Sequence, residues 1–415
     1  MRRFRVYRIL RAAFVIATVA LRYWWLQRRQ PAQAAWDRAH EKTGQAIYRL
    51  ATDLGGAFVK LGQILGARAD VLPPPFVAPL RGLHDRVPAR PLSKLRKHLE
   101  RQLGKPIDQV FSHIEPTALA AASLAQVHRA TLTTGEDVVV KIQYPEARKL
   151  FPIDMGSLRR AVRVARWLNR TIDARPLVDE LAEFVTLELQ FDREARSTER
   201  VRANLSGDPG VIVPTIHHDL STDRVLVLDF LAGTPLTALD KLRARGVDLR
   251  DVAHRIARLY AKMIFEHGFF QGDPHPGNIF VLDDGRIGLL DFGLAKELPP
   301  GFAPAAATMI ARGMAGDNAG ALAAARSIGF VIADDVAPSL LELVRALLGD
   351  YKNAGNMLQQ VRPGQLEIPS HFTLIGRVLV ILSGVSHSLV PNERVIAGAL
   401  IAALAPHLAA AQRAS

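Results

Sequence analysis

The stretch from residue 267 to residue 296 constrains the fold of this chain more than any other. It reads HGFFQGDPHPGNIFVLDDGRIGLLDFGLAK. Two short apolar runs, Ile279–Leu282 and Ile287–Leu290, flank the sequence Asp283-Asp284-Gly285, which is a hairpin turn signal. The pattern therefore predicts a two-stranded ribbon whose open end carries the residues just before and just after these runs.

Three polar residues occupy fixed positions around this hairpin. Asn278 lies five residues after Asp273, and Asp291 lies thirteen residues after Asn278. The hairpin is predicted to bring Asn278 and Asp291 to the same end of the ribbon, where their oxygens suit Mg²⁺ carrying phosphates. The alternative is a polar hairpin beside a Pro-rich turn, in which Gly and Asp serve only the backbone. The joint occurrence of all three residues favours the metal site.

The same spacing is typical of phosphoryl transfer. That reaction needs an orienting carboxylate for the acceptor and metal ligands that neutralise phosphate charge. Protein kinases place a catalytic Asp and an Asn five residues apart and follow them with Asp-Phe-Gly. By this pattern Asp273 would take the role of the base, Asn278 and Asp291 would be the metal ligands, and Phe292-Gly293 completes the tripeptide.

Composition narrows the classes of partner. The chain has 415 residues and no cysteine, which excludes disulfides, thiolate metal sites and a cysteine nucleophile. Its formal net charge of +13 implies an anionic partner, either nucleic acid or an acidic membrane surface. No zinc-finger spacing or aromatic RNA-binding motif is present, so specific nucleic-acid recognition is not expected.

Residues 1–45 are predicted to form a basic amphipathic leader. Met1–Gln30 contains eight Arg and no acidic residue around the apolar run Ala12–Leu21. A helix over Ile9–Leu26 would rise roughly 27 Å, which is marginal for crossing a bilayer. Together with Tyr23, Trp24 and Trp25 this predicts a helix lying on an anionic membrane. A spanning helix, a helix docked on the protein and a signal peptide remain alternatives.

Residues 46–115 are predicted to be a helical extension. The helix over Ala46–Ala67 is interrupted at Gly55-Gly56, and a second amphipathic helix covers Pro91–Leu103. The segment also contains Lys60 and Gln63, which by pattern alone are ordinary solvated or capping residues.

Residues 116–232 change to strand periodicity. A small-residue loop over Thr117–Ser123 is followed by strands at Val127–Leu132 and Val138–Ile142. Lys141 ends a β-branched run, as the phosphate-binding Lys of a kinase does, although a solvent-facing Lys is an equal alternative. An acidic helix over Val178–Val201 is expected to supply one carboxylate partner for it.

The remainder of the chain, residues 233–415, is predicted to be mainly helical. A buried strand over Val225–Phe230 leads into it, and backbone groups near Asp229 and Leu231 would contact an adenine ring. Further helices are expected at Leu239–Arg245, Val252–His267, Ala305–Met314, Ala321–Ser327, Val336–Lys352 and Phe372–Ser386. The last apolar segment, Val395–Ala411, contains Pro406 and predicts a packed terminal helix rather than a membrane span.

With these motifs assembled, the chain resembles the UbiB-type atypical kinases, a family linked to ubiquinone biosynthesis. FVKLGQILGARADVLPPPF is similar to the N-terminal signature of the family, whose KxGQ core is Lys60, Gly62 and Gln63. ALAAASLAQVHRATL is similar to the Ala-rich segment that replaces the kinase glycine loop, and VVVKIQYP follows it. ELQFDREA resembles the acidic helix motif, and GDPHPGN with DFG completes the set.

The resemblance assigns roles to particular residues. Lys141 contacts the α- and β-phosphates, Glu194 orients Lys141, and Glu188 opens the family's ExD motif, which has Gln190 in place of Asp here. The nucleotide loop is Ala120, Ala121, Ala122 and Ser123. Alanine methyl groups exclude backbone conformations that glycine allows. A stiffer or differently shaped phosphate-binding loop is therefore expected. By resemblance, Lys60 and Gln63 point into the nucleotide cleft.

These observations predict an α+β, bilobal protein kinase-like fold, with a small β-rich N-lobe, a helical C-lobe and an N-terminal helical extension. The expected activity is that of an atypical kinase or ATPase that binds ATP and Mg²⁺ at the cytoplasmic face of a bacterial plasma membrane. Quinone-precursor lipids and biosynthetic enzymes are the expected partners by resemblance. A small-molecule phosphotransferase of the aminoglycoside or choline kinase type, and a non-catalytic lipid-binding scaffold, are alternatives.

His275 lies between two prolines and is interpreted as a turn histidine whose ring forms a hydrogen bond with the backbone.

Overall fold

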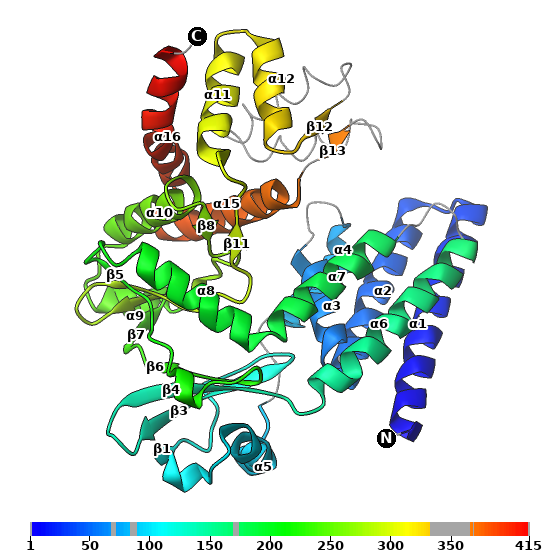
Figure 1. Cartoon of the computed structure of the whole chain (residues 1–415). Helices are drawn as coiled ribbons and strands as arrows, with labels where there is room; N and C mark the ends of the chain where they lie inside the picture. Colours follow the sequence, from blue (N-terminus) through cyan, green and yellow to red (C-terminus); the bar gives the residue numbers. More distant parts are fainter. Residues whose placement is uncertain are drawn as a thin grey trace. The chain divides into compact units, whose positions relative to one another are not determined.

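The computed structural model of the chain divides into two compact units (Figure 1). The structure describes residues 2–67, 72–83, 89–168, 174–332, 366–367 and 369–413. Unit 1 comprises Met1–Arg193 and Ile216–Phe230, and unit 2 comprises Glu194–Thr215 and Leu231–Ser415. Each unit has its own hydrophobic core of buried residues.

Unit 1 contains a five-stranded antiparallel sheet with the order β1-β3-β4-β6, and β2 pairs with β3. The strands are β1 (Phe111–Ile114), β2 (Ala120–Ala121), β3 (Ala125–Leu132), β4 (Asp137–Gln143) and β6 (Val225–Asp229). Val138, Val140 and Ile142 alternate along β4 and are fully buried. Lys141 is therefore on the opposite face of the sheet from these core residues, because successive side chains alternate.

The helices of unit 1 share one hydrophobic core with this sheet. They are α1 (Arg2–Arg29), α2 (Gln33–Leu54), α3 (Ala57–Ala67), α4 (Pro74–Val77), α5 (Leu92–Leu103), α6 (Ala147–Leu168) and α7 (Arg175–Glu188), with the 3₁₀ turns η1 (Ala78–Leu83), η2 (Ile107–Gln109) and η3 (His218–Leu220). The interruption predicted at Gly55-Gly56 is confirmed, since α2 ends and α3 begins there. Both glycines have a positive φ, 65° and 56°, which L side chains rarely adopt.

The single acidic helix predicted over Val178–Val201 is wrong. The chain forms α7, which ends at Glu188, and then α8 (Phe191–Asn204), which begins in unit 1 and continues in unit 2. The break falls at Leu189-Gln190, although the helical pattern of the sequence continues through it. Its cause is a side-chain network from other elements, described below.

Helix α1 is docked on unit 1. It packs against α6 and α2, and Ala12, Val15, Ala20 and Leu26 are buried. Sequence analysis left open whether this helix lies on a membrane, spans it or docks on the protein. In the structure it docks on the other helices of unit 1.

Unit 2 is built on a four-stranded sheet, β5-β10-β9-β7, with two short ribbons, β11-β8 and β12-β13. Its strands are β5 (Val211–Ile212), β7 (Gly233–Pro235), β8 (Phe269–Phe270), β9 (Ile279–Leu282), β10 (Ile287–Leu289), β11 (Lys296–Glu297), β12 (Val331–Ile332) and β13 (Leu366–Glu367). Strands β9 and β10 are antiparallel, which confirms the predicted hairpin.

The helices of unit 2 enclose its core. They are α9 (Leu239–Ala244), α10 (Leu249–Phe265), α11 (Phe302–Met314), α12 (Asn318–Ser327), α15 (Ser370–Leu389) and α16 (Val395–Arg413), with the 3₁₀ turn η4 (Pro276–Asn278). Helix α16 packs against α10 and α11, which confirms a packed terminal helix. The helix predicted at Val336–Lys352 lies outside the described residues.

Two helices in the described ranges are long and apolar enough to cross a bilayer, namely Val6–Arg29 within α1 and all of α15. Helix α15 contributes Val378, Leu382 and Val385 to the core of unit 2. Length and composition alone do not distinguish a span from a packed helix.

Candidate functional site

The hairpin brings two of the predicted metal ligands to one end of the ribbon. Ile279 pairs with Leu289, and the amide of Leu290 donates to the carbonyl of Asn278 at 2.9 Å. Asn278 and Asp291 therefore flank the last ladder contact of β9 and β10. The side chain of Asp291 is exposed and that of Asn278 is half-buried, so both can reach a ligand from solvent.

Asp273 lies on the loop that leads into this ribbon. The amide nitrogen of the Asn278 side chain donates to the carbonyl of Asp273 at 3.2 Å. That bond uses the Nδ2 atom and leaves the amide oxygen of Asn278 as the group that suits a metal ion. The three polar residues of the motif are thus tied together within unit 2.

Gly272 allows this loop to approach the Asp-Phe-Gly segment. A Cβ atom at Gly272 would stand 2.2 Å from the carbonyl oxygen of Leu294, which is an impossible contact. Antiparallel pairing of β8 with β11 holds the same two segments together. Glycine is therefore required here by the close approach of two backbones.

Asp291 has a left-handed backbone, with φ at 60°, which is uncommon for a residue other than glycine. Such conformations persist only where the surroundings determine them, and they cluster at functional sites. The carboxylate Oδ1 of Asp291 accepts from the amide of Gly293 at 3.2 Å, which fixes its direction.

Gln271 clamps the backbone at this strained position. Its side-chain amide donates to the carbonyl of Asp291 at 2.7 Å and also to the carbonyl of Leu290. Its amide oxygen accepts from the hydroxyl of Tyr260 on α10. Gln271 and Tyr260 are both buried, and burial raises the pKa of the Tyr260 hydroxyl well above its usual value, with the nearby Asp273 adding to the effect. Tyr260 therefore stays protonated and remains a donor.

Sequence reasoning missed this clamp. The signal was present, because Gln271 immediately precedes Gly-Asp in the motif and is a polar residue beside two buried phenylalanines. Its partners depend on the tertiary fold and could not be read from spacing.

Glu194, on α8, lies beside the Asp-Phe-Gly turn. A Cβ atom at Gly293 would stand 3.5 Å from Oε2 of Glu194 and 3.4 Å from Oδ1 of Asp291. Glu194 is buried. Glu194 belongs to unit 2 and Lys141 to unit 1, so the predicted pairing of Glu194 with Lys141 stays a prediction.

The donor set fits Mg²⁺ delivered with a nucleotide. Within the described ranges, no group of three or more His, Asp or Glu side chains could hold a metal by itself. One exposed carboxylate and one amide oxygen at the ribbon end leave several positions for phosphate and water oxygens, which is how Mg²⁺ is usually bound.

Lys141 lies on β4 of unit 1. Its Nζ atom is 5.2 Å from the centre of the Phe191 ring, at the start of α8. The side chain is half-buried rather than fully solvated. The ammonium is therefore held near an aromatic face, and the predicted contact of Lys141 with phosphates stays a prediction.

The segment over Thr117–Ser123, predicted to be a loop, contains the short strand β2. Ala120 pairs with Val127, and Ala121 pairs with Gln126. The amide of Ala122 donates to the carbonyl of Ala125 at 2.8 Å, and Ser123 is buried. The Ala122 amide is thus already hydrogen-bonded inside a tight hairpin. In a glycine loop, by contrast, backbone amides are available to bind phosphates.

The two predicted adenine contacts lie on either side of the division between the units. Asp229 is the last residue of β6, and its carboxylate bonds Nε2 of His217 at 3.0 Å. Leu231 is buried and begins a segment of unit 2. Their contact with adenine stays a prediction.

Two of the KxGQ residues, both on α3, make polar contacts within unit 1. Lys60 forms an ion pair with Glu188, the last residue of α7, and both side chains are partly buried. Gln63 donates to the carbonyl of Leu83 at 3.0 Å. A Cβ atom at Gly62 would stand 2.2 Å from Cδ1 of Leu83, so glycine gives that side chain room. Their predicted approach to the cleft stays a prediction.

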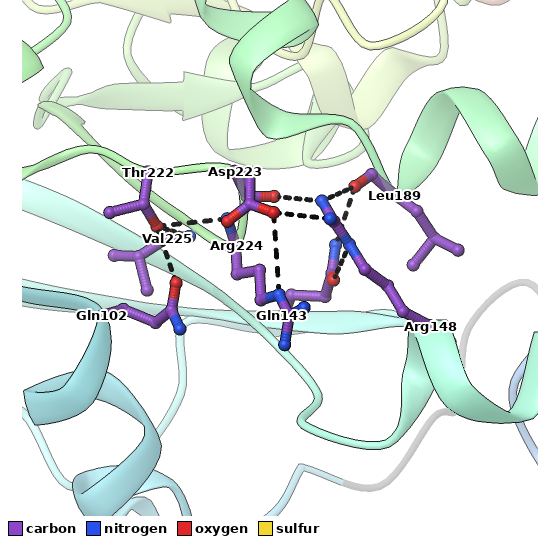
Figure 2. Close-up of polar contacts among 8 residues, drawn as sticks. All are labelled: Gln102, Gln143, Arg148, Leu189, Thr222, Asp223, Arg224 and Val225. Atoms are coloured by element: carbon purple, nitrogen blue, oxygen red, sulfur yellow. Dashed lines mark hydrogen bonds and ion pairs between the residues drawn. The ribbon is translucent and has the colours of Figure 1, made fainter.

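Arg148 holds the break between α7 and α8 (Figure 2). Its Nη2 atom donates to the carbonyl of Leu189 at 2.7 Å, and Gln143 donates to the same carbonyl at 3.2 Å. Nη1 of Arg148 bonds the carboxylate of Asp223 at 2.5 Å. A cation at the end of a helix satisfies carbonyls that have no helical partner.

This network stabilises the turn between the end of α7 at Glu188 and the start of α8 at Phe191. Thr222 supports it by accepting from the amides of Arg224 and Val225, at 3.2 and 3.1 Å. Arg148 is 41 residues from Leu189 in sequence, so no local signal identifies it.

The remaining sequence interpretations concern turn residues. The Nδ1 atom of His275 accepts from the amide of Gly277 at 3.1 Å, which confirms a turn histidine that bonds the backbone. Asp284 accepts from the amide of Arg286 at 3.0 Å within the hairpin turn, and Asp283 pairs with Arg245.

Comparison with known proteins decides the family. A model of the ABC1 atypical kinase-like domain matches residues 82–325, which is more than half of the chain. The chain belongs to the ABC1 atypical kinase-like family. The predicted UbiB-type resemblance is confirmed, and so is the α+β kinase-like fold class.

Relatives of this ABC1 kinase-like chain include proteins named as kinases. AarF domain-containing protein kinase 1 of Xenopus laevis is 32% identical over 309 residues, which is 72% of this chain and 59% of that protein. ACTIVITY OF BC1 COMPLEX KINASE 7 of Arabidopsis thaliana is 38% identical over 250 residues, 59% of this chain and 36% of that protein. An uncharacterized Synechocystis protein is 32% identical over 385 residues, which is 87% of this chain and 68% of that protein.

The chain spans 46% to 68% of the length of the first three curated relatives. Among solved structures, that of Rv3197 from Mycobacterium tuberculosis, in complex with erythromycin, aligns with a TM-score of 0.56 and 26% identity. The alignment covers 87% of this chain and 97% of that chain.

Proposed function

We propose that this chain binds Mg·ATP and either hydrolyses it or transfers its terminal phosphoryl group at a membrane surface, in support of quinone-lipid biosynthesis. The observation that carries the proposal is the end of the β9–β10 ribbon. There an exposed Asp291, held in a left-handed conformation, lies beside Asn278, whose side chain is bonded to Asp273. The quinone connection rests on the family alone.

Each residue has a distinct role in this proposal. Asp291 and the amide oxygen of Asn278 would hold the magnesium ion, which supplies charge neutralisation on the phosphates. Asp273 would orient the acceptor hydroxyl or water. Lys141 would contact the α- and β-phosphates, and Glu194 would orient Lys141.

The alanine hairpin supports slow or restricted transfer. The Ala122 amide is already bonded to Ala125, so fewer backbone donors remain for the phosphates than a glycine loop provides. Binding of nucleotide is compatible with this arrangement, because the metal ligands lie on the other unit.

A second candidate is phosphoryl transfer to a small molecule. The structural relative from Mycobacterium tuberculosis was solved with erythromycin, which favours a small-molecule ligand for that protein. Analysis of the products of ATP turnover distinguishes the candidates, because free phosphate, a phosphorylated lipid precursor and a phosphorylated drug are separable.

Calorimetric titration with ATP tests the proposed nucleotide site. Wild-type protein is expected to bind ATP in the presence of Mg²⁺ and to lose most of this affinity in EDTA. Lys141→Met should weaken binding roughly tenfold to a hundredfold, because it removes a charge-assisted bond to phosphate. Lys149→Met, an exposed lysine eight residues further on, is the matched control. Equal affinity in EDTA, or for Lys141→Met and wild type, would contradict the site.

A further inference from the structure

Helix α1 presents an apolar stripe to solvent. The stripe consists of Val6, Leu10, Phe14, Leu21 and Trp25, and at 100° per residue these positions fall within about one third of the helix surface. Leu10 is 63% and Phe14 66% exposed, although both are large apolar side chains. The stripe runs roughly 28 Å along the helix, which is unusual for a surface left in water.

The opposite face of α1 is locked to the protein by a buried ion pair. Arg8 is 2% exposed, and its guanidinium donates to both carboxylate oxygens of Asp154 on α6, at 2.9 and 2.6 Å. A third donor reaches the carbonyl of Leu54 at the end of α2, at 2.5 Å. Arg8 therefore joins three helices of unit 1.

Docking extends along the length of α1. Arg11 pairs with Asp53 at 2.9 Å, and Arg22 donates to the hydroxyl of Thr43 at 2.9 Å. The hydroxyl of Tyr23 bonds Nδ1 of His40 at 2.7 Å. The charged side chains within the span of the stripe thus all point to partners on α2 and α6, and the stripe itself carries no charge.

This arrangement determines how α1 can meet a bilayer. A spanning helix is surrounded by lipid or by other spanning helices, whereas α1 is held by polar contacts to amphipathic helices rich in charge. A helix lying in the plane of the interface needs only one apolar face. The docked helix offers such a face and keeps its bonded arginines on the other side.

The composition of α1 identifies the surface that it suits. Its sequence contains eight Arg and no acidic residue, and the pairing of Arg8 and Arg11 with aspartates leaves a basic excess on the helix. Near its C-terminal end, Arg28 lies 4.1 Å from the ring of Trp24 and Arg29 lies 4.7 Å from the ring of Trp25. Tryptophan with arginine is typical of a lipid interface. A second copy of α1 would oppose positive charge with positive charge, so an anionic bilayer is the complementary partner.

We infer that α1 is an in-plane lipid-binding helix, locked to unit 1 by Arg8 and Asp154, whose outer stripe inserts into the surface of an anionic bilayer. The inference rests on the membrane part of the proposed function and specifies its geometry. It does not depend on nucleotide binding, so every test below uses the nucleotide-free protein with all 415 residues.

Vesicle flotation tests the stripe. Wild-type protein should bind phosphatidylcholine vesicles that contain phosphatidylglycerol and bind pure phosphatidylcholine weakly. The double variant Leu10→Gln/Phe14→Gln should lose about a hundredfold in affinity, because two apolar side chains no longer leave water. Its unfolding transition should match that of the wild type, because both side chains are exposed. The control is Leu119→Gln/Val331→Gln, at two apolar side chains exposed outside α1.

Equal vesicle binding by the α1 variant and the wild type would overturn the inference. A change in oligomeric state without a change in vesicle binding would assign the stripe to a second copy instead, and would also overturn it.

Depth measurement distinguishes an in-plane helix from a spanning one. The chain has no cysteine, so single substitutions Leu10→Cys, Phe14→Cys and Leu21→Cys each carry one fluorophore without other changes. Quenchers placed at known depths in the vesicles should report the same shallow depth at all three positions. A spanning helix would separate positions 10 and 21 by roughly 16 Å in depth. That gradient would contradict the in-plane arrangement.

Discussion

Asp291→Asn is expected to reduce ATP turnover about 10²- to 10³-fold, the range typical of losing one electrostatic stabiliser of a transition state. The substitution preserves size and the acceptor for the amide of Gly293, so the fold should be retained. It removes the negative charge that would hold Mg²⁺ at the end of the ribbon. Phosphate release, measured with and without anionic vesicles and a phenolic quinone precursor, reports the effect.

Asp284→Asn is the matched control for this prediction. Asp284 lies at the other end of the same hairpin, where its side chain accepts from the amide of Arg286. Asparagine can accept the same bond, so turnover should stay at the wild-type level. Equal turnover by Asp291→Asn and wild-type protein would show that Asp291 holds no catalytic metal, and would favour a scaffold that uses nucleotide without hydrolysis.

Gln271→Met should lower the free energy of unfolding by about 1–3 kcal/mol, because the partly buried carbonyls of Leu290 and Asp291 lose the donor that the buried Gln271 supplies. Methionine has nearly the same length, so little cavity is left. The variant should also require more Mg²⁺ for half-maximal activity, since Asp291 is no longer held in its left-handed conformation. Urea unfolding and magnesium titration of turnover measure the two effects.

Tyr260→Phe separates positioning from stability. It removes the hydroxyl that bonds the oxygen of Gln271 but leaves both donations to the backbone of Leu290 and Asp291. It should therefore destabilise the protein with little change in the magnesium requirement. If Gln271→Met loses stability but keeps the wild-type magnesium requirement, Gln271 only supports the fold and does not position Asp291.

The features that could be predicted from sequence are those with local causes. The β9–β10 hairpin follows from two apolar runs and an Asp-Asp-Gly turn, and it places Asn278 and Asp291 at one end of the ribbon. The interruption at Gly55-Gly56 is equally local, because both residues adopt a positive φ.

Features with distant causes could not be predicted. The sequence of Val178–Val201 is helical throughout, and the break at Leu189 depends on Arg148 and Gln143 from other elements. The clamp on Asp291 depends on Gln271 and on Tyr260 in α10. Helix α1 is apolar on two faces, and its partners on α2 and α6, such as Asp154 for Arg8, show which of them is docked.

Binding of Mn²⁺ followed by electron paramagnetic resonance tests the central claim most directly, because Mn²⁺ accepts the same hard oxygen ligands as Mg²⁺. The account predicts that wild-type protein binds Mn²⁺ tightly only when ADP or ATP is present, and that Asp291→Asn loses this nucleotide-dependent binding while Asp284→Asn retains it. Nucleotide-dependent Mn²⁺ binding that is unchanged in Asp291→Asn would contradict the account.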